Sequence, residues 1–221
     1  SASGPTFNLL SVATLIGAAT DLPRLGVDAV NAADGKYYYY TDDDLALDTG
    51  DTLNIKGPVV IDIRPAATGD LSVQGFGAIV IFAAPTTLNA SLEIHFDDRL
   101  NINSQNALGG IQNLTLDPKR CVLLGSSTYS SSGYHYLRTN GTSLSFYGVI
   151  YMPNAYLHLR NSGYTQSIYG ALSAETIFFD DSTDLHYDTS LRTATISGVD
   201  APYKISEWRE LTDPGERVVL P

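Results

Sequence analysis

The chain has 221 residues, a formal net charge of −11 and a charged fraction of only 17%. Its length suits one large all-β domain, and 19 glycines and 10 prolines with few charges indicate strands and turns rather than a helical bundle. The acidic balance argues against binding to nucleic acid or to an anionic membrane surface, because both require clustered cations. The single cysteine, Cys121, excludes an internal disulfide.

Residues 1–35 are expected to form a helical or irregular N-terminal segment. The stretch 21–35, DLPRLGVDAVNAADG, offers Asp21 as an N-cap, Pro23 in the first turn and Gly35 as a stop. The run LLSVATLIGAA before it is about half as long as a membrane-spanning helix, and it lacks the preceding basic residues of a signal peptide. Any anchor or export signal is therefore expected to lie outside this chain.

Residues 36–200 are expected to form a right-handed parallel β-helix, a solenoid. Short apolar runs such as PVVIDI (58–63), AIVIFA (78–83) and LEIHF (92–96) alternate with Gly, Asp, Asn and Ser, which predicts an all-β protein. The 14–20-residue intervals between these runs, with only one Asn-Gly hairpin dipeptide, favour stacked coils. A β-sandwich is the alternative.

A second repeat lies further along the chain. Tyr147-Gly148 in SFYGVIYMPN recurs 22 residues later as Tyr169-Gly170 in QSIYGALSAE. We expect the tyrosines to stack between successive coils, and the glycines to occupy a corner where a Cβ would clash. The tail, residues 201–221, is expected to cap the end of the stack, with Trp208 packed over it.

The candidate binding surface lies in the segment 125–143, GSSTYSSSGYHYLRTNGTS, which is expected to leave the coil as a loop. Tyrosines beside small polar residues are typical of recognition surfaces, since tyrosine supplies contact area at low entropic cost. The alternative is that alternate tyrosines fill the core, which is the favoured interpretation for the run Tyr37–Tyr40. The candidate binding residues are Tyr129, Tyr134, Tyr136 and Arg138.

Acidic clusters suggest two other kinds of site. Carboxylates crowded into TDDDLALDTGD are hard oxygen ligands suited to a structural calcium ion, and the residues nominated are Asp42, Asp43, Asp44 and Asp48. The pairs Asp97-Asp98 and Asp180-Asp181 could serve as the two carboxylates of a glycosidase if their coils lay side by side. For both sets the favoured interpretation is that aspartates cap turns, and no catalytic residue is assigned.

The histidines show no metal-binding spacing, and no dinucleotide, phosphate-loop or serine-hydrolase motif is present. For the triplet His186-Tyr187-Asp188 we expect a structural role, with the imidazole bonded to a coil backbone and Asp188 capping the next turn. No cofactor is expected other than the calcium considered above.

The C-terminal half resembles the C-terminal domain of bacterial PilX-like type IV pilus-assembly proteins. That family combines an aromatic-Gly-x-Ile-Tyr-Ala-Pro-x-Ala strand, a Tyr-Gly-Ala, a His-Tyr-Asp triplet and a terminal Trp-Arg-Glu. The positions that match are Tyr147, Gly148, Ile150, Tyr151, Pro153 and Ala155; Tyr169, Gly170 and Ala171; His186, Tyr187 and Asp188; and Trp208, Arg209 and Glu210. The resemblance spans about residues 37–212, although Met152 replaces a small residue and the family's N-terminal hydrophobic helix is missing.

The resemblance implies an extracellular or cell-surface domain without chemistry of its own. On that basis we expect a non-catalytic domain that acts in pilus assembly or adhesion, with other pilus or surface proteins, or a glycan, as partners. A membrane would be reached only through a segment absent from this chain. Two alternatives stay open: a carbohydrate-active β-helix enzyme that uses the Asp pairs, and a structural solenoid that forms polymers.

Overall fold

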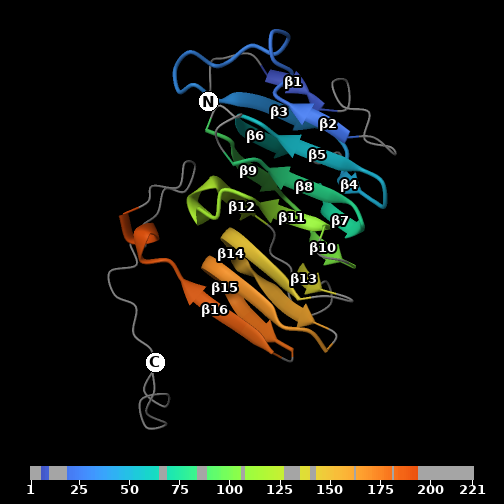
Figure 1. Ribbon diagram of the computed structural model, residues 1–221, viewed down its shortest axis with the longest axis vertical. Coiled ribbons are helices and arrows are strands. Elements are labelled where there is room, and N and C mark those ends of the chain that lie inside the picture. The colour runs from blue at the N-terminus through green and yellow to red at the C-terminus, as the bar shows by residue number, and fades with distance from the viewer. Residues whose placement is uncertain are drawn as a thin grey trace. The chain divides into compact units, whose positions relative to one another are not determined.

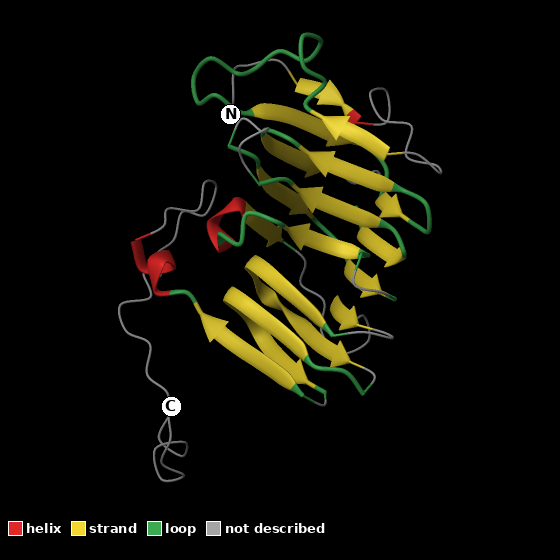
Figure 2. Ribbon diagram, in the orientation of Figure 1, coloured by secondary structure: helices red, strands yellow, loops and turns green. Residues whose placement is uncertain are grey.

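The computed structural model describes residues 6–9, 19–64, 69–83, 89–105, 108–126, 135–139, 143–161, 163–180 and 182–193. The chain divides into two compact units, Ser1–Asp188 and Thr189–Pro221. All the strands belong to the first unit (Figures 1 and 2). The described part of the second unit is the 3-10 helix η2 (Thr189–Thr193).

The first unit is a parallel β-helix whose coils pass through three strand layers, which we call faces A, B and C. Face A contains β1 (Thr6–Asn8), β3 (Tyr37–Thr41), β6 (Pro58–Ile63), β9 (Ser91–Phe96) and β12 (Cys121–Gly125). Face B contains β4 (Leu45–Leu47), β7 (Leu71–Gly75), β10 (Leu100–Ser104) and β13 (His135–Thr139). Face C contains β2 (Ala19–Leu22), β5 (Thr52–Ile55), β8 (Ala78–Ile81) and β11 (Gly110–Asn113).

Each strand pairs in parallel with the strand one coil away on the same face, and every pairing among the described strands is parallel. A β-sandwich is built from antiparallel sheets. The expected solenoid is therefore confirmed and the sandwich alternative is wrong.

Two long strands join the faces in the last coils. β14 (Leu144–Asn161) pairs with β12 on face A through Val149–Tyr151 and with β13 on face B through Leu157–Asn161. β15 (Gln166–Phe179) follows β14 in parallel, with an irregularity between Met152 and Tyr156, and β16 (Thr183–Tyr187) pairs with the start of β15. This continuity explains why faces A and B form a single 12-stranded sheet.

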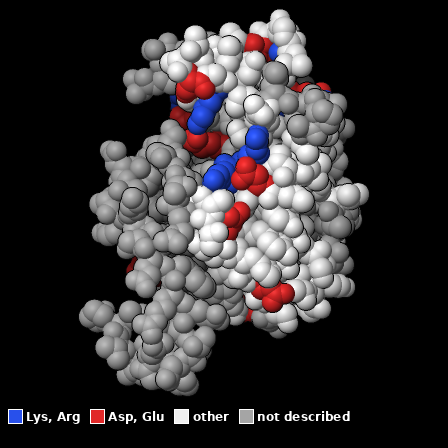
Figure 3. Space-filling view, turned by 60° about the vertical axis from the view of Figure 1, so that its left-hand side comes forward, with Lys and Arg blue, Asp and Glu red and all other residues white. Residues whose placement is uncertain are grey.

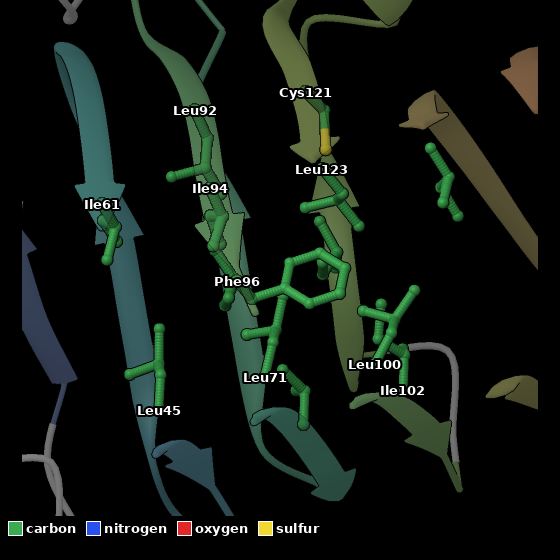
Figure 4. Close-up of a cluster of buried hydrophobic side chains, with 14 of the residues drawn as sticks. Leu45, Ile61, Leu71, Leu92, Ile94, Phe96, Leu100, Ile102, Cys121 and Leu123 are labelled. Carbon is green, nitrogen blue, oxygen red and sulfur yellow. The ribbon is translucent and has the colours of Figure 1, made fainter. Parts of the chain in front are cut away.

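Strand alternation sends every second side chain into the space between the faces. On face A one inward column is in register over five strands and is at most 1% exposed: Tyr39, Ile61, Ile94, Leu123 and Ile150. Leucines of face B, such as Leu71 and Leu100, point into the same core (Figure 4). Burying each such side chain contributes about 1.5–3 kcal/mol, so the inward columns hold the coils together.

The run Tyr37–Tyr40 follows the same alternation. Tyr39 is inward and buried, whereas the Tyr38 hydroxyl donates to Asp34 and Tyr40 lies under the Arg64 guanidinium, 4.4 Å from the ring centroid. The interpretation that alternate tyrosines fill the core is confirmed.

The expected coil length needs correction. β6 pairs with β9, so that Val59 lies beside Leu92, 33 residues later, whereas β8 belongs to face C. The intervals of 14–20 residues therefore separate strands on different faces. One full coil takes 22 residues between Tyr147 and Tyr169 and more where loops leave the corners.

The helix expected over residues 21–35 is also wrong. β2 and a series of turns occupy this stretch. Asp21 is a strand residue that accepts hydrogen bonds from Asn54 Nδ2 at 2.8 Å and Lys56 Nζ at 2.5 Å, so cross-coil pairing replaces helix capping. Because β1 and β2 already belong to the sheets, the solenoid begins before residue 36. The expected cap, residues 201–221 with Trp208, lies outside the described residues.

The turns after β2 are anchored by a buried carboxylate. Asp28 is 8% exposed and accepts hydrogen bonds from the Arg24 guanidinium (2.7 Å) and the Tyr39 hydroxyl (2.6 Å). Burial alone would raise the pKa of Asp28, but these hydrogen bonds outweigh it and hold the pKa below its ordinary value. Within the described ranges, no helix has the length and apolar character needed to cross a membrane.

Candidate binding surface on face B

The outward positions of face B bring together residues from three successive coils. Tyr136 on β13 pairs with His158 on β14, which pairs with Phe178 on β15. Two residues along each strand on the same side, Arg138 pairs with Arg160. With Tyr156, which lies beside Phe178, these residues form what we call the face-B patch: Tyr136, Arg138, Tyr156, His158, Arg160 and Phe178.

Aromatic rings form one column of the face-B patch. The Tyr136 and His158 ring centroids are 5.6 Å apart, and those of His158 and Phe178 are 6.1 Å apart with an edge-on arrangement. The Tyr156 ring meets Phe178 edge-on at 5.9 Å. Phe178 is 43% exposed. Exposed aromatic groups whose neighbours hold them in place offer apolar contact area to a ligand.

The second column of the patch carries excess positive charge. His158 Nε2 lies 2.8 Å from Asp180 Oδ2, and Arg160 Nε lies 3.9 Å from the same oxygen. Arg138 forms no ion pair with another described residue, and its Nε is buried with no hydrogen-bond partner in the described part of the chain. Since a buried donor normally has a partner, this nitrogen marks a place where a ligand acceptor would be favourable.

This arrangement is unusual in so acidic a chain. Other basic side chains in the described ranges are already paired with acids: Arg24 with Asp28, Lys36 with Glu93, Lys56 with Asp21, Arg64 with Asp62 and Arg120 with Asp117. The face of the molecule in Figure 3 has the same character, with basic side chains lying beside acidic ones.

The two columns continue as polar residues on the preceding coils. Asn101 pairs with Tyr136 and Asn103 with Arg138, so these amides stand in the same outward rows. One coil earlier the rows hold Ser72 and Gln74, and the Gln74 amide donates to the Ser72 hydroxyl at 2.8 Å. The outside of face B thus changes along the solenoid axis from small hydrogen-bonding groups to aromatic rings and guanidinium groups.

The structure brings together two of the four binding residues predicted from sequence. Tyr136 and Arg138 lie in a strand and point outward, not in a loop, while Tyr129 and Tyr134 lie outside the described residues. Sequence analysis missed His158, Arg160 and Phe178. The 22-residue repeat of the Tyr-Gly pair was the available signal, because it also relates Tyr136 to His158 and Arg138 to Arg160.

The Tyr-Gly repeat is confirmed as a structural ladder. The Tyr147 and Tyr169 rings stack with centroids 4.5 Å apart, and His186 stacks on Tyr169 at the same distance. An ideal Cβ on Gly170, where φ is +145°, would overlap the carbonyl oxygen of Gly148. For His186, expected to bond to a coil backbone, the contact observed is this ring stack, and the Asp188 amide donates to the Gly170 carbonyl at 3.3 Å.

The aspartates nominated for calcium do not gather around one point. Asp42, Asp43, Asp44 and Asp48 are exposed, and Asp44 Oδ1 accepts from the Asp70 amide at 2.9 Å. The Asp48 amide donates to Asp51 Oδ2 at 2.9 Å. Across the described ranges no three His, Cys, Asp or Glu side chains cluster as metal ligands. These contacts fit the turn-capping interpretation, and the calcium site gains no support.

The carboxylates nominated for glycoside hydrolysis are also apart. Asp97 follows β9 and accepts from the Ser126 hydroxyl, whereas Asp180 follows β15 and contacts His158. β9 and β15 are three strands apart in the sheet, or about 14 Å at the usual strand spacing. That exceeds the roughly 6.5–9.5 Å that separates the carboxylates of inverting glycosidases. Asp181 lies outside the described residues.

Residues 13–194 match a protein family described as a domain of unknown function, DUF7305. The chain belongs to this family. The matched region runs from before β2 to just beyond η2, so the parallel β-helix is the fold of this DUF7305 member, and it includes the whole face-B patch. No curated protein and no solved structure matches the chain.

Proposed function

We propose that this DUF7305 chain is a non-catalytic binding domain of a bacterial cell-surface or pilus-associated protein. It contacts a glycan or a protein partner through the face-B patch, in adhesion or pilus assembly. The observation that carries the proposal is Arg138, an arginine with no described acid partner and a buried Nε without an acceptor, set between aromatic rings.

The scaffold suits recognition. The strands under the patch are fixed on both sides, β13 by β10 and β14 and β14 by β13 and β15, so its side chains are held on a rigid surface. A preorganised surface loses little conformational entropy when a ligand binds. The extracellular location and the link to pili rest on the resemblance to PilX-like proteins at positions such as Tyr147 and Tyr169.

The absence of catalysis is part of the proposal. Asp180 is the one carboxylate that contacts the described patch, and hydrolysis of a glycosidic bond needs two. A patch that binds a polymer without cutting it is what adhesion requires.

A binding array with product analysis tests this function. The full chain and the variant Arg138→Gln are applied to immobilised polysaccharides and peptides, and each bound ligand is then examined for cleavage. Arg64→Gln is the matched control, because it removes the same charge from an arginine that already pairs with Asp62 on face A. We expect a bound, uncleaved ligand whose retention falls in Arg138→Gln but not in Arg64→Gln. Cleavage, or binding that is indifferent to Arg138, would overturn the proposal.

A polymer-forming solenoid is the second candidate, and one observation favours it. Phe179 and Leu185 stand at core-facing positions of the last coil, yet they are 51% and 40% exposed. An exposed apolar end is suited to stacking against another solenoid end. Sedimentation velocity over a hundredfold concentration range tests this: growing species lost in Leu185→Glu would support polymerisation, and a constant monomer would exclude it.

A further inference from the structure

We infer that the ligand of the face-B patch is an acidic polysaccharide, whose carboxylates pair with Arg138 and Arg160 while its sugar rings lie against the neighbouring aromatic column. This inference rests on the proposed function and adds the chemical class of the ligand.

The spacing of the two arginines is the first step. Arg138 and Arg160 are directly paired across adjacent parallel strands, so their side chains start about 4.8 Å apart. Like charges at such positions repel one another. The one carboxylate seen near them, that of Asp180, is 3.9 Å from Arg160 and is shared with His158. Two guanidinium groups therefore face outward with a single shared counter-charge.

The geometry of the guanidinium group selects carboxylates. Its planar fork donates two parallel hydrogen bonds to the two oxygens of one carboxylate. Arginines repeated from strand to strand along the solenoid axis would match a ligand that presents acids at intervals along its own length. A polymer of uronic acids has this pattern.

The aromatic column distinguishes a glycan from an acidic peptide. Tyr136, His158 and Phe178 form a row beside the arginines and provide apolar surface for the C–H faces of sugar rings. Ser72, Gln74, Asn101 and Asn103 extend the rows with groups that can exchange hydrogen bonds with sugar hydroxyls.

A peptide would gain much of its affinity by adding a strand to a sheet edge. At the patch that route is closed, because β13 and β14 are each paired on both sides. The side chains alone must supply the contacts, which favours the sugar polymer over an extended acidic peptide.

Calorimetric titration with three probes tests the inference. The probes are an oligomer of galacturonic acid, the same oligomer with its carboxylates methyl-esterified, and a polyglutamate peptide of equal charge. The protein is the full chain, with variants Arg138→Gln, Arg138→Lys and the control Arg64→Gln. Circular dichroism spectra and unfolding midpoints establish that each variant is folded.

We expect the acidic oligomer to bind and its ester to bind at least about tenfold more weakly, the usual value of a charge-assisted hydrogen bond. Arg138→Gln should show the same loss, Arg138→Lys a smaller one because it keeps the charge without the fork, and Arg64→Gln none. Binding should also weaken as salt rises.

Three results would overturn the inference. Equal binding of the ester, with no effect of Arg138→Gln, would make the ligand neutral and leave a glycan-binding function standing. Tighter binding of polyglutamate would make the partner an acidic protein. If no probe binds, the acidic-glycan assignment fails, and the array described above decides separately whether the patch has another ligand.

Discussion

His135 should make the fold sensitive to mild acid. Its side chain is fully buried at an inward position of face B, and its Nδ1 accepts a hydrogen bond from the Leu100 amide at 3.0 Å. Because Nδ1 is an acceptor, the ring is neutral in the folded protein. Burial in the core, and then the charge of nearby Arg99, lower the pKa of His135 to about 4.

The sign and size of the effect follow from proton linkage. An unfolded histidine has a pKa of about 6.5, so between pH 6.5 and 4 the unfolded chain binds a proton that the folded chain rejects. Stability is unaffected above this window and falls as the pH is lowered through it. The expected loss from this one residue is about 2 kcal/mol between pH 7 and pH 5 and about 3 kcal/mol below pH 4.

Urea unfolding followed by circular dichroism at pH 7, 6 and 5 measures this loss. The comparison is His135→Asn, whose amide oxygen can still accept from Leu100 but does not titrate. The other histidines and the carboxylates are the same in both proteins, so their contributions cancel in the difference. We expect the variant to lose about 2 kcal/mol less than the wild type over this range. If both proteins lose the same free energy, His135 is accessible to protons and the reasoning is wrong.

Three further predictions concern the solenoid itself. Gly170→Ala should cost about 3 kcal/mol or more, since it adds a clash with a backbone oxygen to an unfavourable φ, whereas Gly163→Ala, with open space around it, should cost about 1–2 kcal/mol; urea unfolding of both variants tests this order. The Cys121 thiol, whose pKa burial raises to about 12, should react with a thiol reagent only on unfolding, so burst labelling of the native protein would contradict its burial. Tyr39→Phe should destabilise by about 1–3 kcal/mol by removing a donor from buried Asp28, and an unchanged urea midpoint would refute this.

The fold class could be predicted because its signals are local. Short strands, frequent turns and the alternation of residues such as Tyr37–Tyr40 follow from backbone geometry, and the 22-residue repeat fixes the last coils. Coil length elsewhere was not predictable from spacing, because each corner holds a loop of a different size. The N-terminal segment was misjudged because the hydrogen bonds of Asp21 to the next coil depend on contacts 33 and 35 residues away.

The binding surface was only half predictable for a related reason. Tyrosine and arginine beside small residues drew attention to Tyr136 and Arg138, but whether they point inward or outward depends on strand register. Their partners come from later coils, and His158 and Phe178 have no distinctive composition around them. Stacking creates the patch, so the sequence shows it only when the repeat is applied to every position of the coil.

The face-B patch should carry a cost in stability that its ligand offsets. In the same outward row, the earlier coils hold the amides of Gln74 and Asn103, which bear no charge, and the later coils hold Arg138 and Arg160. Changing Arg138 to glutamine removes a buried donor without an acceptor and a like-charge neighbour. We therefore expect Arg138→Gln to raise the free energy of unfolding by up to about 1 kcal/mol, while it weakens binding to the acidic oligomer.

Opposite effects on stability and on binding distinguish a recognition residue from a structural one. Urea unfolding and calorimetry on the same protein samples measure both, with Arg64→Gln as the control, because its partner Asp62 would lose an ion pair and the variant should not gain stability. If Arg138→Gln is instead less stable than the wild type by 1 kcal/mol or more, the arginine is held by contacts within the fold. Its position between aromatic rings would then be explained by packing, and the case for a carboxylate ligand would lose its main support.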